Sequence, residues 1–500
     1  MLLWWAAAYA GSLELLEVGG FWGSPATTEP SAVYWNPGAL GAQRGTRFYL
    51  EGAPVFATVR FDREDPYWGG RQDYKLATVA PFGAIVTDAG VPGLGFGVGF
   101  AIPMARGANP VQEDGPGRTH LRVGDIKAIQ VPVGIGYMYK NLFGVGASVS
   151  YVLGTWYADL DTSVAPDLYD ELDKQTAEVD LSPYEDPSIV ENPRYLSRLR
   201  FGDLIAHDVT FAVGVHARPH PMLDLSLSYQ HGWRADHGGR GQLNFNCPPD
   251  TDGSGRFGAE TRGLCNTELE SDVSVGYRYP AKIRFGVAIT PDPNARVEIF
   301  GAYTFWRVFT DFEIGIDEST LRFTDGGEVL EETATLVGRD RLWARDNRDS
   351  WSLGVDAKYR ILDRYRVGVR AGFDRSAVPD EVLSPNNFDG DTLVFGGMFG
   401  VAPVKELEIG LGFTEAFVFQ RTVTNSAFSQ VIPPSERVEG RYFYPSMNGT
   451  YSNSIHRVSI SLKGQFDGSR RAAKRRSRDA LETPDPAGPA DPASPVGEGR

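Results

Sequence analysis

Side chains alternate between apolar and small or polar types over unusually long stretches of this chain. From Val273 to Ile289 every odd position is apolar or aromatic, and the positions between them are small, polar or cationic. The same period of two recurs over 143–151, 223–230 and 406–413. Because successive side chains of a β-strand point to opposite faces, each stretch predicts a strand with one apolar face.

The length of these stretches distinguishes between a soluble β-protein and a membrane barrel. Strands of soluble sandwiches average about five or six residues, whereas a tilted strand needs about nine to eleven residues to cross a bilayer. The run from Phe143 to Tyr151 already spans nine residues. No stretch of eighteen apolar residues occurs, which excludes membrane-spanning helices. The 58 glycines and 12% aromatic residues fit an all-β protein.

The links between the stretches fall into two length classes. Short turns such as Lys140-Asn141 alternate with long loops such as 161–198, a pattern typical of outer-membrane barrels. The sequence therefore predicts an all-β fold, a transmembrane antiparallel β-barrel of about fourteen strands over 44–466. We expect upward strands at 44–62, 92–104, 142–160, 222–240, 295–315, 364–377 and 406–422, and downward strands at 76–88, 121–140, 199–218, 270–290, 346–361, 391–402 and 451–466.

Three segments lie outside the predicted barrel. Residues 1–10 are apolar and end in Ala8-Tyr9-Ala10, which predicts a signal peptide, short enough to be incomplete, cleaved after Ala10. The alternative is a hydrophobic N-terminus that stays attached. Residues 11–43 are rich in Gly, Pro, Ser, Thr and Ala; we expect them to form a plug inside the lumen, with a flexible periplasmic arm as the alternative. Residues 467–500 are basic, then rich in Pro and Ala, which predicts a disordered periplasmic tail.

Two groups of residues are candidates for ligand contact. Lysine and arginine are costly on the lipid face, so parity places Arg278, Lys282 and Arg284, and separately Arg366 and Arg370, in the lumen. Lys282 or Arg370 then anchors a carboxylate head group by a charge-assisted hydrogen bond; alternatively these cations pair with lumen acids or hold the plug. The plug aromatics line an apolar pocket or form the plug's own core: Phe21, Trp22, Tyr34 and Trp35. We also expect the plug to contain the gate, formed by these aromatics together with Asn36, Pro37 and Gly38.

Composition narrows the chemistry further. The net charge of -15 argues against nucleic acid as a partner. Cys247 and Cys265 lie in one external loop and are expected to form a disulfide rather than a metal site. The 7 histidines are scattered and no nucleophile elbow or phosphate-binding loop appears, so we expect neither an enzyme, nor a cofactor, nor a bound metal.

Four motifs in order along the chain resemble the FadL/TodX-type outer-membrane transporters of long-chain fatty acids and aromatic hydrocarbons. Asn36-Pro37-Gly38 is similar to the family's Asn-Pro-Ala plug motif, with glycine in place of alanine. Tyr279-Pro280-Ala281 opens a segment similar to the family's Pro-Ala strand. Tyr303-Thr304-Phe305-Trp306 and the stretch from Arg370 to Pro385 resemble a strand ending in aromatics and an Arg-x-Gly strand with a proline-containing loop.

The resemblance implies a fourteen-stranded barrel with a plug, and passive uptake of a hydrophobic molecule that leaves sideways through the wall. Long-chain fatty acids are the first substrate class it suggests. The last strand, ending at Phe466, resembles the signal read by the barrel-assembly machinery. We expect a monomer surrounded by outer-membrane lipids. Two other functions remain open: a general porin for polar solutes, and a structural or adhesive surface barrel.

Overall fold

The computed structural model describes residues 18–65, 67–162, 191–194, 196–246, 267–329, 341–426 and 447–466. Three predictions lie outside the described residues: the signal peptide over 1–10, the disulfide between Cys247 and Cys265, and the tail over 467–500. Among the described helices, none has the length and apolar character needed to cross a membrane.

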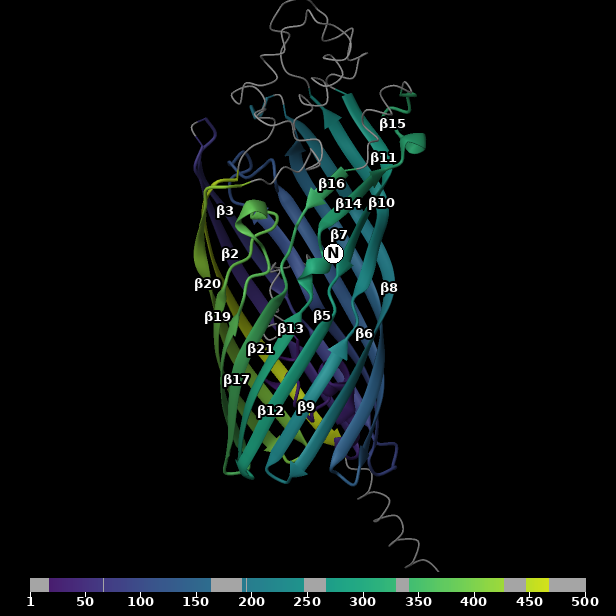
Figure 1. Cartoon of the computed structure of the whole chain (residues 1–500), viewed down its shortest axis with the longest axis vertical. Coiled ribbons are helices and arrows are strands. Elements are labelled where there is room, and N and C mark those ends of the chain that lie inside the picture. The colour runs from purple at the N-terminus through teal and green to yellow at the C-terminus, as the bar shows by residue number, and fades with distance from the viewer. Residues whose placement is uncertain are drawn as a thin grey trace, which may run out of the picture.

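The described strands form a closed barrel of fourteen antiparallel strands, with long connections at one end and short turns at the other (Figure 1). The last strand closes the wall, since β21 (Gly449–Phe466) pairs with β1 (Thr46–Gly52) and β2 (Pro54–Arg63). Most of the remaining wall consists of β3 (Gly70–Val79), β4 (Phe82–Thr87), β5 (Leu94–Pro110), β6 (Val123–Tyr139), β7 (Phe143–Thr162), β8 (Ser197–His220), β9 (Leu223–Gln230), β10 (Trp233–Phe245), β11 (Thr267–Tyr279), β12 (Lys282–Asp292), β13 (Ala295–Thr304), β17 (Ser350–Ile361), β18 (Tyr365–Asp374), β19 (Thr392–Val404) and β20 (Leu407–Val423).

The short turns have the geometry that joins twisted strands tightly. Lys140 and Asn141 between β6 and β7 have φ values of 48° and 58°, and Leu362 and Asp363 between β17 and β18 have 53° and 52°. Two successive residues with positive φ are the mark of a type I′ turn, whose twist matches that of the strands it connects. These turns confirm the short links predicted at both places.

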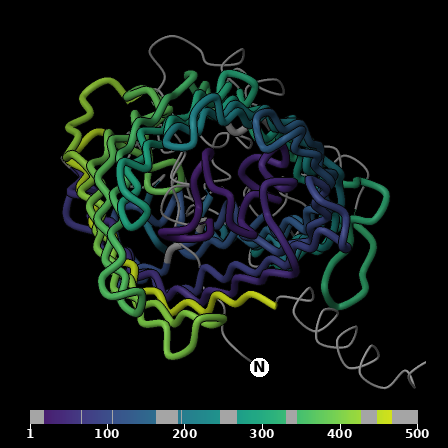
Figure 2. The backbone as a smooth tube through the Cα atoms, turned by 90° about the horizontal axis from the view of Figure 1, so that it is seen from below, coloured from purple at the N-terminus to yellow at the C-terminus, as the bar shows by residue number. Residues whose placement is uncertain are grey.

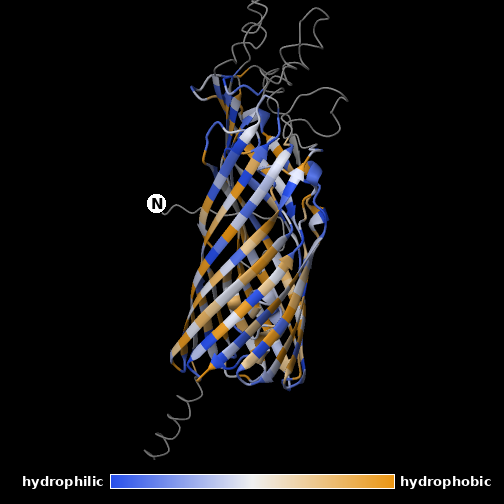
Figure 3. Ribbon diagram, turned by 90° about the vertical axis from the view of Figure 1, so that its left-hand side faces the viewer, coloured by the Kyte–Doolittle hydropathy of each residue, from blue (hydrophilic) through white to orange (hydrophobic). Residues whose placement is uncertain are grey.

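The predicted alternation is confirmed along most of the wall. Outward positions such as Val369, Leu411 and Ile460 are 63%, 56% and 63% exposed. Inward neighbours such as Arg370 and Ser459 are buried. The hydropathy view shows apolar residues over the lower wall and more polar residues toward the long loops (Figure 3). A lipid-facing band with polar extensions is what a transmembrane barrel requires.

The predicted strand over 270–290 is wrong in one respect. β11 ends at Tyr279 and β12 begins at Lys282, and the inward face changes parity between them. Tyr277 and Tyr279 pack in the lumen, whereas Arg278 is exposed on the outer face, so its predicted inward placement is incorrect. Pro280 offers no N–H to the ladder and interrupts it. Lys282 and Arg284, beyond the break, are buried on the lumen side as predicted.

Residues 18–43, here called the lumen segment, lie inside the barrel near the end with short turns (Figures 1 and 2). They form η1 (Gly20–Trp22), α2 (Ala32–Trp35) and η2 (Pro37–Ala42). A hydrophobic cluster joins Trp35, Val33 and Leu40 to wall residues such as Tyr49 and Phe82.

Glycines in the wall let the lumen segment approach closely. A Cβ at Gly214 would lie 2.0 Å from the Asn36 side-chain oxygen, and one at Gly146 would lie 2.2 Å from the Pro37 carbonyl oxygen. Both distances are far inside van der Waals contact. At these positions glycine lets the backbone of the lumen segment approach the wall closely.

The upper wall is extended by short elements between β13 and β17, and the strands among them pair within the sheet. η4 (Trp306–Val308) and β14 (Asp311–Ile316) follow β13, where a single strand was predicted over 295–315. Trp306, Phe309 and Phe312 are buried in the upper lumen. The other short elements are η5 (Glu318–Thr320), β15 (Arg322–Phe323), β16 (Arg341–Ala344) and η6 (Asp380–Val382).

Candidate functional site: an apolar cavity above a lumen segment

An apolar cavity, here called the upper cavity, lies in the half of the lumen nearer the long loops. About 50 Å³ of it is open to the centre of a water molecule. Its walls come from β2, β3, β5, β6, β7 and β14 and from the loops between β5 and β6 and between β18 and β19. They include Ala57, Val59, Tyr74, Leu76, Leu121, Ile126, Trp156, Ala158, Phe312, Pro385 and Phe388. Ligand sites of this kind are concave and mostly apolar with few polar groups.

Aromatic side chains support the walls of the upper cavity. The Trp156 ring lies 5.1 Å from Phe201 and 5.8 Å from Phe312, centre to centre. Tyr74 is satisfied within the protein, since its hydroxyl donates to the Leu121 carbonyl at 3.2 Å. Tilted ring pairs at these separations stabilise each other beyond their buried area. The cavity therefore has rigid aromatic walls.

The barrel wall beside the upper cavity lacks part of its backbone pairing. β3 and β5 pair only at Tyr74–Pro110 and Lys75–Asn109, while β4 pairs with β5 from Phe82–Ala101 onward. Within the described strands, Leu76–Val79 therefore has no partner in β5, and Leu76 also lines the cavity. Unpaired strand edges are costly in a membrane protein, so the missing hydrogen bonds weaken the wall locally along this stretch.

Two loops cover the cavity from the outside. In the loop between β5 and β6, a Cβ at Gly117 would lie 3.2 Å from Pro385 in the loop between β18 and β19. Arg421 fixes the second loop by donating to the carbonyl oxygens of Val378 and Asp389 at 2.8 and 2.9 Å. Phe388 from that loop stacks on Tyr451, 5.6 Å between centres.

A buried ion-pair network joins the first loop to the rest of the outer end. Arg63 at the end of β2 donates two hydrogen bonds to the Glu191 carboxylate, at 2.7 and 3.0 Å. Arg118 donates to the Glu191 carbonyl and lies over the Trp68 ring. Burial raises the pKa of Glu191 despite the neighbouring Arg63, and burial lowers the pKa of Arg118. Buried ion pairs therefore hold in place the loops that cover the cavity.

The predicted ligand-binding cations lie lower, around the lumen segment. Arg370 donates to the carbonyl oxygens of Gly20 and Gly23 at 2.8 and 3.1 Å, and to Asp356 at 2.7 Å. Arg284 donates to Tyr34 at 3.4 Å and also to the Gln230 side chain. Lys282 donates to the Tyr279 hydroxyl at 3.0 Å.

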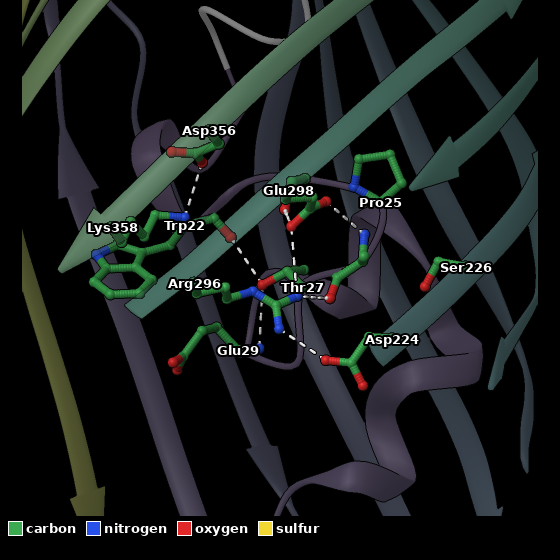
Figure 4. A network of polar contacts seen from close by, with 12 residues as sticks. Trp22, Pro25, Thr27, Glu29, Asp224, Ser226, Arg296, Glu298, Asp356 and Lys358 are labelled. Carbon is green, nitrogen blue, oxygen red and sulfur yellow. Dashed lines mark hydrogen bonds and ion pairs between the residues drawn. The ribbon is translucent and has the colours of Figure 1, made fainter. Parts of the chain in front are cut away.

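A second polar network holds the lumen segment at the end with short turns (Figure 4). Glu298 of β13 accepts hydrogen bonds from the Ser24 hydroxyl and the Ala26 N–H, both at 2.9 Å. Arg296 donates to the Ala26 carbonyl at 2.6 Å and to Asp224 at 2.8 Å. The segment is therefore bound to the wall through its main chain as well as its side chains.

Trp22 sits among three cations of the wall. The charged groups of Lys463, Arg366 and Lys358 lie 3.5, 4.6 and 5.0 Å from its ring centre. Glu29 pairs with Lys463 at 3.2 Å. Burial would raise the pKa of Glu29, but the charges of Lys463, Arg47 and Arg366 lower it to about 2. Cation–π contacts and this ion pair fix the indole in place.

The structure thus brings some predicted residues together and separates others. Phe21, Trp22, Tyr34 and Trp35 are buried among lumen-segment and wall residues and do not line the upper cavity. Asn36 caps η2 by accepting from the Gly38 N–H at 3.0 Å, ahead of Pro37. Their role as a gate remains a prediction.

Sequence reasoning missed the cavity residues Trp156, Phe312 and Phe388. Glu298 was also missed, although its inward parity between Val297 and Ile299 gave a signal for it. Within the described part of the chain, no cluster of side chains suited to a metal ion occurs.

Comparisons with known proteins agree with this architecture. The crystal structure of a Pseudomonas aeruginosa FadL homologue matches with a TM-score of 0.65 at 15% identity, over 92% of this chain and 98% of that one. The Pseudomonas putida toluene transporter TodX matches with a TM-score of 0.62 at 15% identity, over 92% and 99%. The Ralstonia pickettii toluene transporter TbuX gives 0.54 at 17% identity, over 87% and 94%.

At such low identity these structures establish the fold alone. A search of curated proteins gave no match. A family model described as outer membrane protein transport protein (OMPP1/FadL/TodX) matches residues 21–466, which include the lumen segment from Phe21 and the whole barrel. The chain therefore belongs to the OMPP1/FadL/TodX family of outer-membrane transport proteins.

Proposed function

We propose that this protein carries small hydrophobic molecules across the outer membrane. The observation that carries the proposal is the upper cavity, an apolar space that adjoins the stretch where β3 and β5 do not pair. A molecule enters from the loop side, rests against the aromatic walls, and leaves between β3 and β5 toward the lipid. Leu76 belongs to both the cavity and the unpaired stretch.

The lumen segment acts in this proposal as a plug that prevents straight passage to the periplasm. Its many hydrogen bonds to the wall support a closed lumen, as does the close fit of η2 against wall glycines. The proposal also draws on relatives named as toluene transporters and as a monoaromatic hydrocarbon channel. A non-enzymatic monomer inserted by the barrel-assembly machinery fits this role.

A general porin is the main alternative, and it needs a wet lumen with room for polar solutes. The packed lumen segment argues against a porin, because it fills space that polar solutes would need. Liposome swelling with small sugars separates the two functions: a porin gives rapid swelling, whereas a plugged transporter gives rates near those of protein-free liposomes. An adhesive barrel predicts no uptake of either kind of solute.

The direct test measures entry of the neutral fluorescent dye N-phenyl-1-naphthylamine into porin-deficient cells that make this protein. We expect entry well above the vector control. Leu76→Trp fills the cavity beside the unpaired stretch and should return entry to the vector level. Leu411→Trp is the matched control, because Leu411 is 56% exposed on the outer face of β20, a strand that borders neither the upper cavity nor the unpaired stretch. Equal entry by both variants and the original protein would refute the proposed route.

A further inference from the structure

We infer that the upper cavity selects electrically neutral molecules and discriminates against carboxylates such as ionised fatty acids. This inference rests on the proposed uptake function and specifies its substrate class. The family resemblance first suggested long-chain fatty acids as substrates, and the inference differs from that expectation.

The lining of the upper cavity offers no positive charge. Among the described residues that form it, none is Lys, Arg or His. Its one charged member is Asp125, whose carboxylate is paired with Lys127, and its other polar members include Asn386 and Tyr74. A carboxylate placed there would lose its water and would find no cation among the described residues of the lining.

The lumen cations that were candidate anchors are out of reach of such a ligand. Lys282 and Arg284 are 1% and 0% exposed, and Arg370 is 5% exposed. A surface that a water molecule cannot touch is also closed to a larger carboxylate. Their hydrogen bonds to Tyr279, Tyr34 and the lumen segment occupy them further.

Arg345 is a cation directly behind the cavity lining, and it could attract a carboxylate if it were accessible. Its guanidinium lies over the Phe312 ring, 4.5 Å from the centre, and Phe312 lines the cavity. However, Arg345 is 0% exposed and is not part of the lining. The phenyl ring therefore stands between this charge and the cavity.

The aromatic walls also make favourable contacts with a neutral ligand. Trp156 and Phe312 offer ring faces and edges to a bound molecule, and pairs of aromatic rings prefer tilted or offset contacts. A buried charge without a partner is strongly disfavoured. A small aromatic hydrocarbon gains the ring contacts and does not pay the cost of burying a charge.

The test compares toluene with benzoate, which share one ring and differ by the charged group. Radiolabelled uptake is measured at neutral pH in porin-deficient cells with an intact lipopolysaccharide layer, relative to the vector. We expect the protein to accelerate toluene entry by at least about tenfold more than benzoate entry, because an unpaired carboxylate must be desolvated. The pair 1-hexadecanol and palmitate repeats the comparison for a long chain.

Two variants sharpen the test. Leu76→Lys places a cation in the lining and should lower toluene entry and raise benzoate entry; heat-modifiable migration on a gel confirms that the barrel is folded. Arg345→Met should leave the preference for toluene unchanged. Benzoate entry equal to or faster than toluene entry, or benzoate entry that depends on Arg345, would overturn the inference while leaving hydrophobic uptake intact. If neither toluene nor 1-hexadecanol enters faster than in the vector control, the proposed function itself fails.

Discussion

Arg370 is a single residue that ties the lumen segment to the barrel wall. Its parity on β18 indicated an inward side chain, and the structure adds its partners, two carbonyl oxygens of the lumen segment and the Asp356 carboxylate. It also lies 5.3 Å from the centre of the Phe21 ring. These contacts support the alternative in which the lumen cations hold the plug.

Replacing Arg370 by methionine should loosen the lumen segment. The change leaves Asp356 buried with one fewer cation, and breaking a buried ion pair costs about 3–5 kcal/mol. Hydrogen exchange of the amides in residues 18–43 should become faster by orders of magnitude while the wall stays protected. Arg360→Met is the matched control, since Arg360 is 44% exposed in its side chain and lies 4.0 Å from Asp363. Unchanged exchange in Arg370→Met would exclude this anchoring role.

At the scale of elements, the loops of the outer end form a roof and the lumen segment forms a floor. The roof depends on pairs between distant parts of the chain, such as Arg63 with Glu191 and Gly117 beside Pro385. The floor depends on wall glycines that allow backbone to meet backbone. Between them the upper cavity keeps its apolar lining.

Glu191→Gln should open the roof. The substitution keeps the shape of the side chain but removes one of the carboxylates that pair with the fully buried Arg63, leaving Asp65 at 3.3 Å, and breaking a buried pair of this kind costs about 3–5 kcal/mol. We expect faster hydrogen exchange in the loop over 111–122. Asp73→Asn is the control, because its partner Arg71 is 48% exposed in its side chain and such surface pairs contribute about 0–1 kcal/mol. Equal protection of the loop in both variants would contradict the proposed network.

At the scale of the whole molecule, the barrel is a boundary between lipid and a packed interior. Outward residues of β20 and β21 such as Phe413 and Ile460 are exposed and apolar, and inward residues of the same strands are buried. Closure between β1 and β21 leaves no free edge at the ends of the wall. The unpaired stretch between β3 and β5 interrupts the sheet beside the upper cavity.

A charge on the lipid face should therefore destabilise the barrel according to its depth. Ile460→Arg places a guanidinium in the middle of the apolar band and should cost roughly 2–4 kcal/mol, whereas Leu362→Arg at a turn should cost about 0–1 kcal/mol. Leu362 is 84% exposed in the short turn between β17 and β18. Urea unfolding in lipid vesicles measures both. Equal costs for the two changes would mean that the band does not face lipid at the depth inferred here.

The sequence by itself determined the barrel, because alternation is a local property of each strand and every strand repeats it. The short turns and the lumen position of Lys282, Arg284 and Arg370 followed from the same local rule. The sequence pattern placed Arg278 on the wrong face. The break at Pro280 exchanges the inward and outward positions between β11 and β12, while the alternation of apolar residues continues unchanged.

Only the tertiary structure decided which groups meet. Arg370 and Gly20 are 350 residues apart in the chain, and their hydrogen bond exists because the barrel closes around the lumen segment. The upper cavity likewise joins Leu76, Trp156 and Pro385, three residues from separate strands and a loop. Pairing across a closed sheet depends on register and on how loops fold inward, and neither is encoded by the period of any one strand.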